Sequence, residues 1–147
     1  MEIVDFQKDE FIISTDPGLI DVDVVHNYLA NESYWAQGRA RDVVERSIEN
    51  SLCFGVYNDA GQIGFARVVT DFSVFAYILD LYILSDFGGQ GLGKWLMSCI
   101  LIHPEMQGDL KWALCTSDAH GLYEKFNFKH LENSEKWMTM HGGFRQN

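Results

Sequence analysis

Hydrophobic positions in the first third of the chain recur at helical spacing. A short apolar segment at residues 11–14 is typical of a strand, and Asp16 with Pro17 then forms a typical helix start. The apolar positions that follow are Ile20, Val24, Val25, Tyr28 and Leu29. A second amphipathic set comprises Val43, Val44, Ser47 and Ile48. The pattern predicts one strand followed by two helices, each with one buried face.

The middle of the chain is rich in the β-branched and aromatic residues that favour strands. Residues 52–57 and 63–70 are joined by the turn-forming segment 58–61, which predicts a hairpin. Residues 74–84 are a longer run of the same kind. We therefore expect a central strand there, ending at a glycine-rich segment.

A third amphipathic pattern follows the glycines and ends before Pro104, which cannot continue a helix. Its apolar positions are Leu92, Trp95, Leu96, Cys99 and Ile100. Residues 111–116 predict a buried strand, residues 119–126 a short helix, and residues 137–141 a last strand. The expected fold class is α/β (α+β), with element order βααβββαβαβ(β) and a mixed central sheet flanked by helices.

Length and composition favour one globular domain over residues 1–147. Hydrophobic residues make up 47% and charged residues 22%, which excludes a disordered or coiled-coil chain. The formal net charge of −10 repels phosphate backbones and anionic lipid, and no Lys/Arg run offsets it. We therefore expect no nucleic acid and no membrane as partners.

The cysteine pattern favours a reducing compartment. The three cysteines, Cys53, Cys99 and Cys115, form no CxxC pair, and each lies in an apolar run typical of a buried thiol. The first residues have no basic region followed by a long apolar stretch, so they do not resemble a signal peptide. The predicted location is cytoplasmic.

The glycine-rich segment at residues 88–93 lies between a predicted strand and a predicted helix. A helix start offers unpaired backbone N–H groups and a partial positive charge, so it can bind an anion, although such glycines also occur in plain turns. A Walker A loop needs Ser or Thr where Trp95 stands. A dinucleotide fingerprint needs a third glycine where Lys94 or Leu96 stands. Both patterns are near misses.

A third pattern fits better. The segment LDLYILSDFGGQGLGKWLMSCIL resembles the GNAT superfamily of acetyl-CoA-dependent N-acetyltransferases, whose signature is a strand, then Gln/Arg-x-x-Gly-x-Gly/Ala, then a helix. Gly91 and Gly93 stand on the two small positions, and Gly88 replaces the Gln or Arg. The later segment DAHGLYEKFNF resembles the family's A-x-x-L-Y-x-x-x-G-F motif. Tyr123 stands on its tyrosine, and Asn127 replaces its glycine.

The resemblance implies acetyl-CoA as acetyl donor and a direct attack in a ternary complex, without an acyl-enzyme. It also implies a set of cofactor-binding positions: Leu81, Tyr82, Ile83, Gly88, Gly89, Gln90, Gly91, Leu92, Gly93, Lys94, Thr116 and Tyr123. Backbone groups of residues 81–83 would pair with pantetheine, and an N–H near Ile83 would stabilise the oxyanion. Thr116 stands where many members carry an asparagine.

Two tyrosines are the candidate catalytic residues. Tyr123 is the expected general acid, because a phenol with a pKa of about 10 can protonate a departing thiolate. The general base is open between Tyr77, another group and solvent. Strand alternation places Tyr77 with Leu79 on one face and Asp80 on the other, where it is a structural carboxylate unless a β-bulge changes the register.

The resemblance implies an acceptor site near Tyr34 and Trp35, an aromatic pair that would stack on a substrate or simply staple the two helices. No histidine stands at metal-ligand spacing, so no metal is expected. The predicted function is acetyl transfer to a primary amine, on a small molecule or a protein. A non-catalytic acyl-CoA sensing module is the alternative, a nucleotide-binding ATPase is a third option, and a homodimer is left open.

Overall fold

The computed structural model describes residues 1–143 of the 147-residue chain. The chain forms two units, Met1–Thr116 and Ser117–Asn147, and each is described by itself. The first unit holds the whole sheet and three of the four α-helices found in the described residues. The interpretation of residues 1–147 as one domain stays a prediction.

The sheet has six strands, which lie in chain order from β1 to β6. Their bounds are Asp5–Lys8 (β1), Phe11–Ser14 (β2), Leu52–Asn58 (β3), Gly61–Thr70 (β4), Phe75–Ile83 (β5) and Lys111–Leu114 (β6). Neighbours are antiparallel except β5 and β6, which are parallel. The predicted hairpin and the mixed sheet are therefore confirmed.

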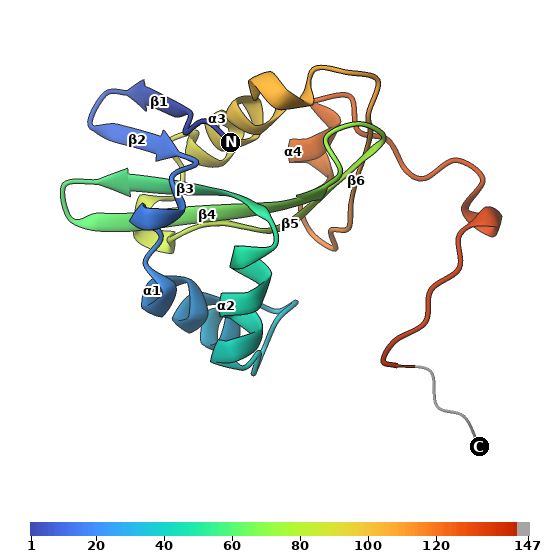
Figure 1. The fold of residues 1–147 in the computed structure, drawn as a ribbon, viewed down its shortest axis with the longest axis horizontal. Coiled ribbons are helices and arrows are strands. Elements are labelled where there is room, and N and C mark those ends of the chain that lie inside the picture. The colour runs from blue at the N-terminus through green and yellow to red at the C-terminus, as the bar shows by residue number, and fades with distance from the viewer. Residues whose placement is uncertain (144–147) are drawn as a thin grey trace. The chain divides into compact units, whose positions relative to one another are not determined.

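Helices cover the sheet of the first unit. The α-helices are Val22–Asn27 (α1), Arg41–Glu49 (α2), Leu92–Leu101 (α3) and, in the second unit, His120–Glu124 (α4). Figure 1 shows α1 and α2 on one side of the strands and α3 on the other. Side chains of α1 and α2 pack on the sheet in a core cluster of Val25, Leu29, Ala36, Val44, Cys53, Phe65 and Tyr82. We call this side of the sheet the α1/α2 face.

The first predicted helix is divided into three short pieces. Asp16 accepts a hydrogen bond from the N–H of Gly18, but it caps only a 3₁₀ turn at Pro17–Leu19. The chain then becomes extended at Ile20, and α1 begins after a second cap, Asp21, which accepts from the N–H of Val24. A π-helical turn at Tyr28–Glu32 follows α1. Two competing caps close together explain why one long helix does not form.

The element order differs from the expected one at both ends. The strand β1 was not predicted, because its sequence DFQK is mostly polar and it lies at the sheet edge. The predicted last strand at residues 137–141 is wrong: a 3₁₀ turn at Ser134–Lys136 is followed by chain without regular structure. Met138 is 92% exposed and Met140 69%, so these two apolar side chains, which suggested a strand, face solvent.

Three burial predictions also change. The strand β6 is only partly buried, because it is the other edge of the sheet. Val43 is exposed, since the buried face of α2 is centred on Val44. Cys53 and Cys99 are buried as expected, whereas Cys115 is exposed just after β6. The observed order over the described residues is ββααβββαβα.

Candidate active site

A β-bulge in β5 sets the geometry of the site. Phe65 of β4 pairs with Tyr82 of β5, but Arg67 pairs with Leu79. One residue of β4 therefore faces two residues of β5, Asp80 and Leu81. Asp80 has a φ of 54°, the left-handed conformation in which Asp and Asn are tolerated best after glycine.

The bulge corrects the expected position of Asp80. Without the extra residue, Asp80 would share the face of Ile78 and point toward α3. With it, the carboxylate reaches Arg67 and lies on the α1/α2 face, as Tyr77 and Leu79 do. The sequence placed Asp80 on the wrong side because a strand pattern of period two cannot show where a bulge occurs.

Three donors surround this carboxylate. Asp80 Oδ2 accepts from Arg39 Nη1 at 2.9 Å and from Arg67 Nε at 3.0 Å. Its other oxygen, Oδ1, accepts from Trp35 Nε1 at 2.9 Å. The Asp80 side chain is 0% exposed, against 11% for Arg67 and 23% for Arg39. We call these four residues the Asp80 cluster. The Asp80 carboxylate therefore already accepts three hydrogen bonds, which hold it in place on this face.

The edge of β5 beyond the bulge is open on one side. Pairing between β5 and β6 ends at Ile78 and Leu114, although β5 continues to Ile83. The expected cofactor positions Leu81, Tyr82 and Ile83 therefore have no β6 partner. Backbone groups on this side of residues 79–83, which we call the open seam, can pair with an extended ligand as an added strand would.

The glycine loop continues from the open seam through a 3₁₀ turn at Ser85–Phe87. Gly89 and Gly91 have φ values of 79° and 80°, which glycine adopts without strain. Gly91 is the N-cap of α3, and the first backbone bond of that helix runs from the N–H of Trp95 to the carbonyl of Gly91. The N–H groups of residues 92–94 therefore have no partner within the helix.

This loop is accessible to a ligand. Gly88, Gly89, Gln90 and Gly91 are exposed, and a Cβ added at Gly89, Gly91 or Gly93 would meet no heavy atom within 4 Å. The structure thus brings together all the expected loop positions, from Gly88 to Lys94, around one helix start. Dipole, unpaired N–H groups and open space favour a phosphate there.

Tyr77 lies on β5 opposite Ala113 of β6, just before the open seam begins. Its hydroxyl donates a hydrogen bond to the Cys115 sulfur at 3.2 Å. That bond, together with partial burial, raises the pKa of Tyr77 to about 12. At neutral pH the Tyr77 hydroxyl therefore keeps its proton and donates it in the hydrogen bond to Cys115. This state argues against Tyr77 as the general base.

The predicted acceptor residues lie beside the Asp80 cluster. Trp35 is part of that cluster through its indole N–H, so its ring is fixed. Tyr34 stands edge-on to Trp35 with ring centres 5.1 Å apart, and the two side chains remain 51% and 38% exposed. Tyr28 stacks on Tyr82 at 3.7 Å, which joins this aromatic surface to β5. The Tyr34–Trp35 pair thus links the α1/α2 side to the sheet and also exposes ring surface to solvent.

Two predicted residues lie at or beyond the end of the first unit. Thr116 is its last residue, two positions after β6. Tyr123 belongs to α4 of the second unit, where it is buried and packs edge-on against Phe128 with ring centres 6.1 Å apart. Asn127 has a φ of 70°, the left-handed conformation expected for a residue that replaces glycine. The roles of Thr116 and Tyr123 stay predictions.

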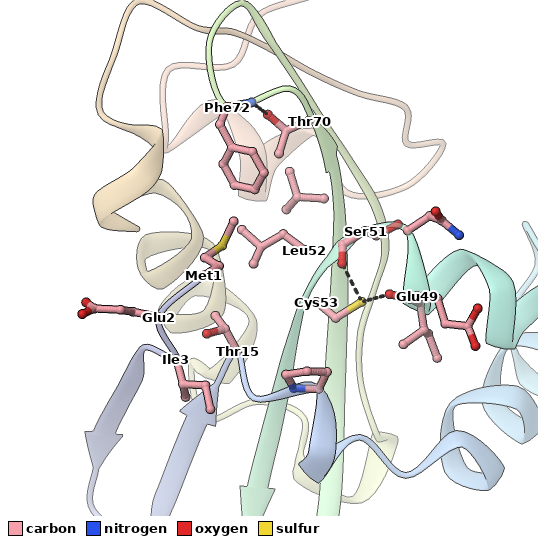
Figure 2. A pocket seen from close by; sticks show the side chains of 14 residues that line it. Met1, Glu2, Ile3, Thr15, Glu49, Ser51, Leu52, Cys53, Thr70 and Phe72 are labelled. Carbon is pink, nitrogen blue, oxygen red and sulfur yellow. Dashed lines mark hydrogen bonds between the residues drawn. The ribbon is translucent and has the colours of Figure 1, made fainter.

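A separate cavity of about 400 Å³ lies elsewhere in the first unit. It is lined by Met1–Ile3, Thr15 and the start of β3, and Figure 2 shows Leu52 and Phe72 facing into it. Pairing of β2 with β3 ends at Ser14 and Gly55, which leaves this space beside the first residues of β3. None of the predicted site residues lines the cavity, so it is distinct from the open seam.

Residues 1–143 contain neither a metal-ligand cluster nor a membrane-spanning helix. No three His, Cys, Asp or Glu side chains in this range converge as they would around a metal ion. None of the helices in the same range has the length and hydropathy that crossing a bilayer would require.

Sequence reasoning missed Arg39 and Arg67 as site residues. Arg67 is 9% exposed and is the one charged residue of β4, where it lies between apolar neighbours. A buried arginine needs an anionic partner. This single charge in an apolar run therefore indicated that the nearby Asp80 lies on the same face of the sheet as Arg67. Arg39 lies in a loop between helices, and its sequence context carries no comparable signal.

Comparison with known proteins adds an independent result. Residues 49–130 match the family model of the acetyltransferase (GNAT) domain. A solved structure from Xanthomonas campestris pv. campestris, assigned to the GNAT family of acetyltransferases, is 36% identical with a TM-score of 0.88, over 92% of this chain and 96% of that one.

Two more distant proteins agree. A Gibberella zeae protein assigned as an acetyltransferase is 29% identical over 120 residues, 69% of this chain and 67% of that protein. A Clostridium acetobutylicum structure, assigned as an acetyltransferase and solved with acetyl-CoA, is 16% identical with a TM-score of 0.61, over 95% of this chain and 96% of that one. At this identity the likeness shows the fold alone.

Proposed function

This chain belongs to the GNAT family of acetyltransferases, and on that premise we propose that it transfers an acetyl group from acetyl-CoA to a primary amine. The observation that carries the proposal is the continuous path from the open seam to the start of α3. An extended chain can pair with backbone groups along residues 79–83, and a pyrophosphate can meet the N–H groups of residues 92–94 at the start of α3. The relative from Clostridium acetobutylicum that holds acetyl-CoA has the same fold.

The residues of the seam and loop fit such a donor. Acetyl-CoA supplies a thioester whose carbonyl is attacked by the amine. In this chain, the glycine loop leaves room for phosphate oxygens, since Gly88 adds no side chain where the family often has Gln or Arg. Backbone N–H groups then replace the missing side chain contact. An N–H near Ile83 is positioned on the seam to stabilise the negative charge that develops on the carbonyl oxygen.

The reaction is a direct transfer in a ternary complex. A bond forms between the amine nitrogen and the acetyl carbon, the C–S bond breaks, and its electron pair stays on sulfur. We assign Tyr123 as the group that protonates this sulfur. The amine must lose a proton, and we assign that proton to solvent, because Asp80 is held by three donors and Tyr77 donates to Cys115.

A non-catalytic acyl-CoA sensing module is the second candidate. The absence of a free carboxylate base on β5 favours it, as Asp80 is fully occupied. Turnover separates the two functions, since a sensing module binds acetyl-CoA without releasing its thiol to an amine. The acceptor, a small molecule or a protein amino group, is treated below. The homodimer and the cytoplasmic location stay predictions.

The proposal is tested by ligand-induced stabilisation followed by turnover. A ligand that binds only the folded protein stabilises it by about 2.7 kcal/mol at a hundredfold excess over Kd. We expect acetyl-CoA and CoA to raise the melting temperature, and ATP with Mg²⁺ or NAD to have little effect. Thiol release from acetyl-CoA with a panel of amines then supports the enzyme. A larger shift with ATP would refute the assignment of the loop.

A further inference from the structure

The charges around Asp80 do not balance. Two guanidinium groups bind one carboxylate, which leaves one excess positive charge within the Asp80 cluster. Arg67 is fixed at both ends, because its Nε donates to Asp80 and its Nη1 donates to Ser51 Oγ at 3.2 Å. Arg39 donates to Asp80 through Nη1 alone among the described residues and keeps 23% of its side chain exposed. Arg39 therefore carries the unused hydrogen-bonding capacity of the cluster.

This excess charge lies beside the proposed reaction centre. Asp80 is the bulged residue of β5, and the next three residues form the part of the open seam that we assign to the thioester. The exposed rings of Tyr34 and Trp35 adjoin Arg39 through Trp35 and the shared carboxylate. A small acceptor that lies on these rings with its amine toward the seam would cover Arg39.

Covering Arg39 has an electrostatic cost that depends on the acceptor. A substrate that displaces water from a guanidinium must replace those hydrogen bonds, and an anionic group does so best, with the paired geometry that arginine favours. The rest of the chain repels anions, since its net charge is −10. A local positive charge in so acidic a protein is therefore a selective feature of this site.

We infer that the acceptor is a small amine that carries a carboxylate or phosphate close to its amino group, and that Arg39 binds this anionic group. The inference rests on the proposed acetyltransferase function and specifies its substrate class.

Matched amine pairs test the inference. Phenylalanine is compared with phenethylamine for the carboxylate, and O-phosphoethanolamine with ethanolamine for the phosphate, by kcat/KM for thiol release from acetyl-CoA. A hydrogen bond to a charged group changes affinity by roughly 10- to 100-fold. We expect the anionic member of at least one pair to be preferred by that factor, and the pair that shows it identifies the group.

Variants of Arg39 assign the preference to this residue. In Arg39→Gln, the ratio of kcat/KM between the two members should fall toward one, and in Arg39→Lys it should be intermediate. A purely structural role would lower both members alike and leave the ratio unchanged. Arg41→Gln is the matched control, because Arg41 is an exposed arginine of the same segment that pairs with Asp23 and Glu45. It should keep the wild-type ratio.

Several outcomes overturn the inference. The inference is wrong if neutral amines react as well as their anionic counterparts. It is also wrong if the preference for the anionic amine persists in Arg39→Gln. Absence of turnover with every amine, while calorimetry shows acetyl-CoA binding, also counts against it. If acetyl-CoA fails to bind the unmutated protein, the proposed function fails instead. Should Arg39→Gln not fold, the unmutated protein and Arg39→Lys decide the question.

Discussion

We propose two ligand sites at neighbouring parts of β5, and they are built in opposite ways. The open seam and the glycine loop offer exposed backbone groups, and their side chains are small or point elsewhere. The Asp80 cluster, whose carboxylate comes from the same stretch of β5, is a site of side chains: a fully buried Asp80 is held by Arg67 and by the partly exposed Arg39 and Trp35. One strand thus carries a backbone site on its edge and a side chain site on its face.

The difference teaches how each region responds to substitution. A backbone site loses function when an added side chain blocks the approach of a ligand, and its stability is largely independent of what binds there. A buried charge cluster depends on every partner, because removal of one leaves the others unpaired in a dry environment. Substitutions at the seam should change binding, whereas substitutions at the cluster should change stability or selectivity.

The largest expected effect is at Tyr123, which belongs neither to the open seam and glycine loop nor to the Asp80 cluster. If its hydroxyl protonates the leaving thiolate, Tyr123→Phe removes the proton and keeps the ring against Phe128. The turnover rate should fall by about 10²–10⁴, while acetyl-CoA affinity changes little. Steady-state thiol release and calorimetric binding measure the two effects.

Tyr57→Phe is the control for this variant. The Tyr57 hydroxyl is buried without a hydrogen-bond partner within the described residues, so its removal should leave turnover unchanged. An unchanged rate in Tyr123→Phe would exclude Tyr123 as the acid. Loss of binding with a normal rate per bound complex would make it a donor contact only.

Asp80→Ala tests the difference in stability between the two regions. This variant leaves Arg39 and Arg67 without their common anion. Removal of one partner from a buried ion pair typically costs about 3–5 kcal/mol, so the free energy of unfolding should fall by that order. Asp23→Ala removes an exposed carboxylate that pairs with Arg41, and an exposed pair contributes far less to stability because solvent screens it. Denaturant unfolding of both variants measures the difference. Equal losses would mean that the Asp80 cluster is not a buried charge site.

The smallest expected effect is at the glycine loop. Gly93 lies in the first turn of α3 with open space around its Cβ position, so Gly93→Val should fold normally and weaken CoA binding by roughly tenfold, as the side chain meets the phosphates. Gly91 is less suitable, because its φ of 80° would strain any other residue. Calorimetric titration with CoA measures the loss. The control is Arg46→Val, at an exposed helical position of α2, which should bind CoA as the unmutated protein does. If Gly93→Val keeps the affinity of the unmutated protein for CoA, the phosphates do not bind at this loop.

Most of the fold could be predicted from local pattern. The hairpin of β3 and β4, the strand β5 and the helix α3 follow from alternation, turn residues and helical spacing, which act over a few residues. The misses are at the edges, where pattern is weak: β1 is polar, and residues 137–141 are apolar but exposed. The glycine loop could also be predicted from the sequence. Its proposed role depends on the absence of side chains, which the glycines show directly.

The acceptor side was decided by tertiary structure. A single extra residue in β5 turns Asp80 to the face where Arg39, 41 positions earlier, and Arg67, 13 positions earlier, can reach it. Neither the bulge nor these distant pairings leaves a periodic trace in the sequence, since they result from how β4 and β5 pair and how the loop before α2 packs on them. The sequence by itself therefore determined the glycine loop that we propose as a backbone site for an anion, and only the folded sheet determined which side chains surround the proposed acceptor position.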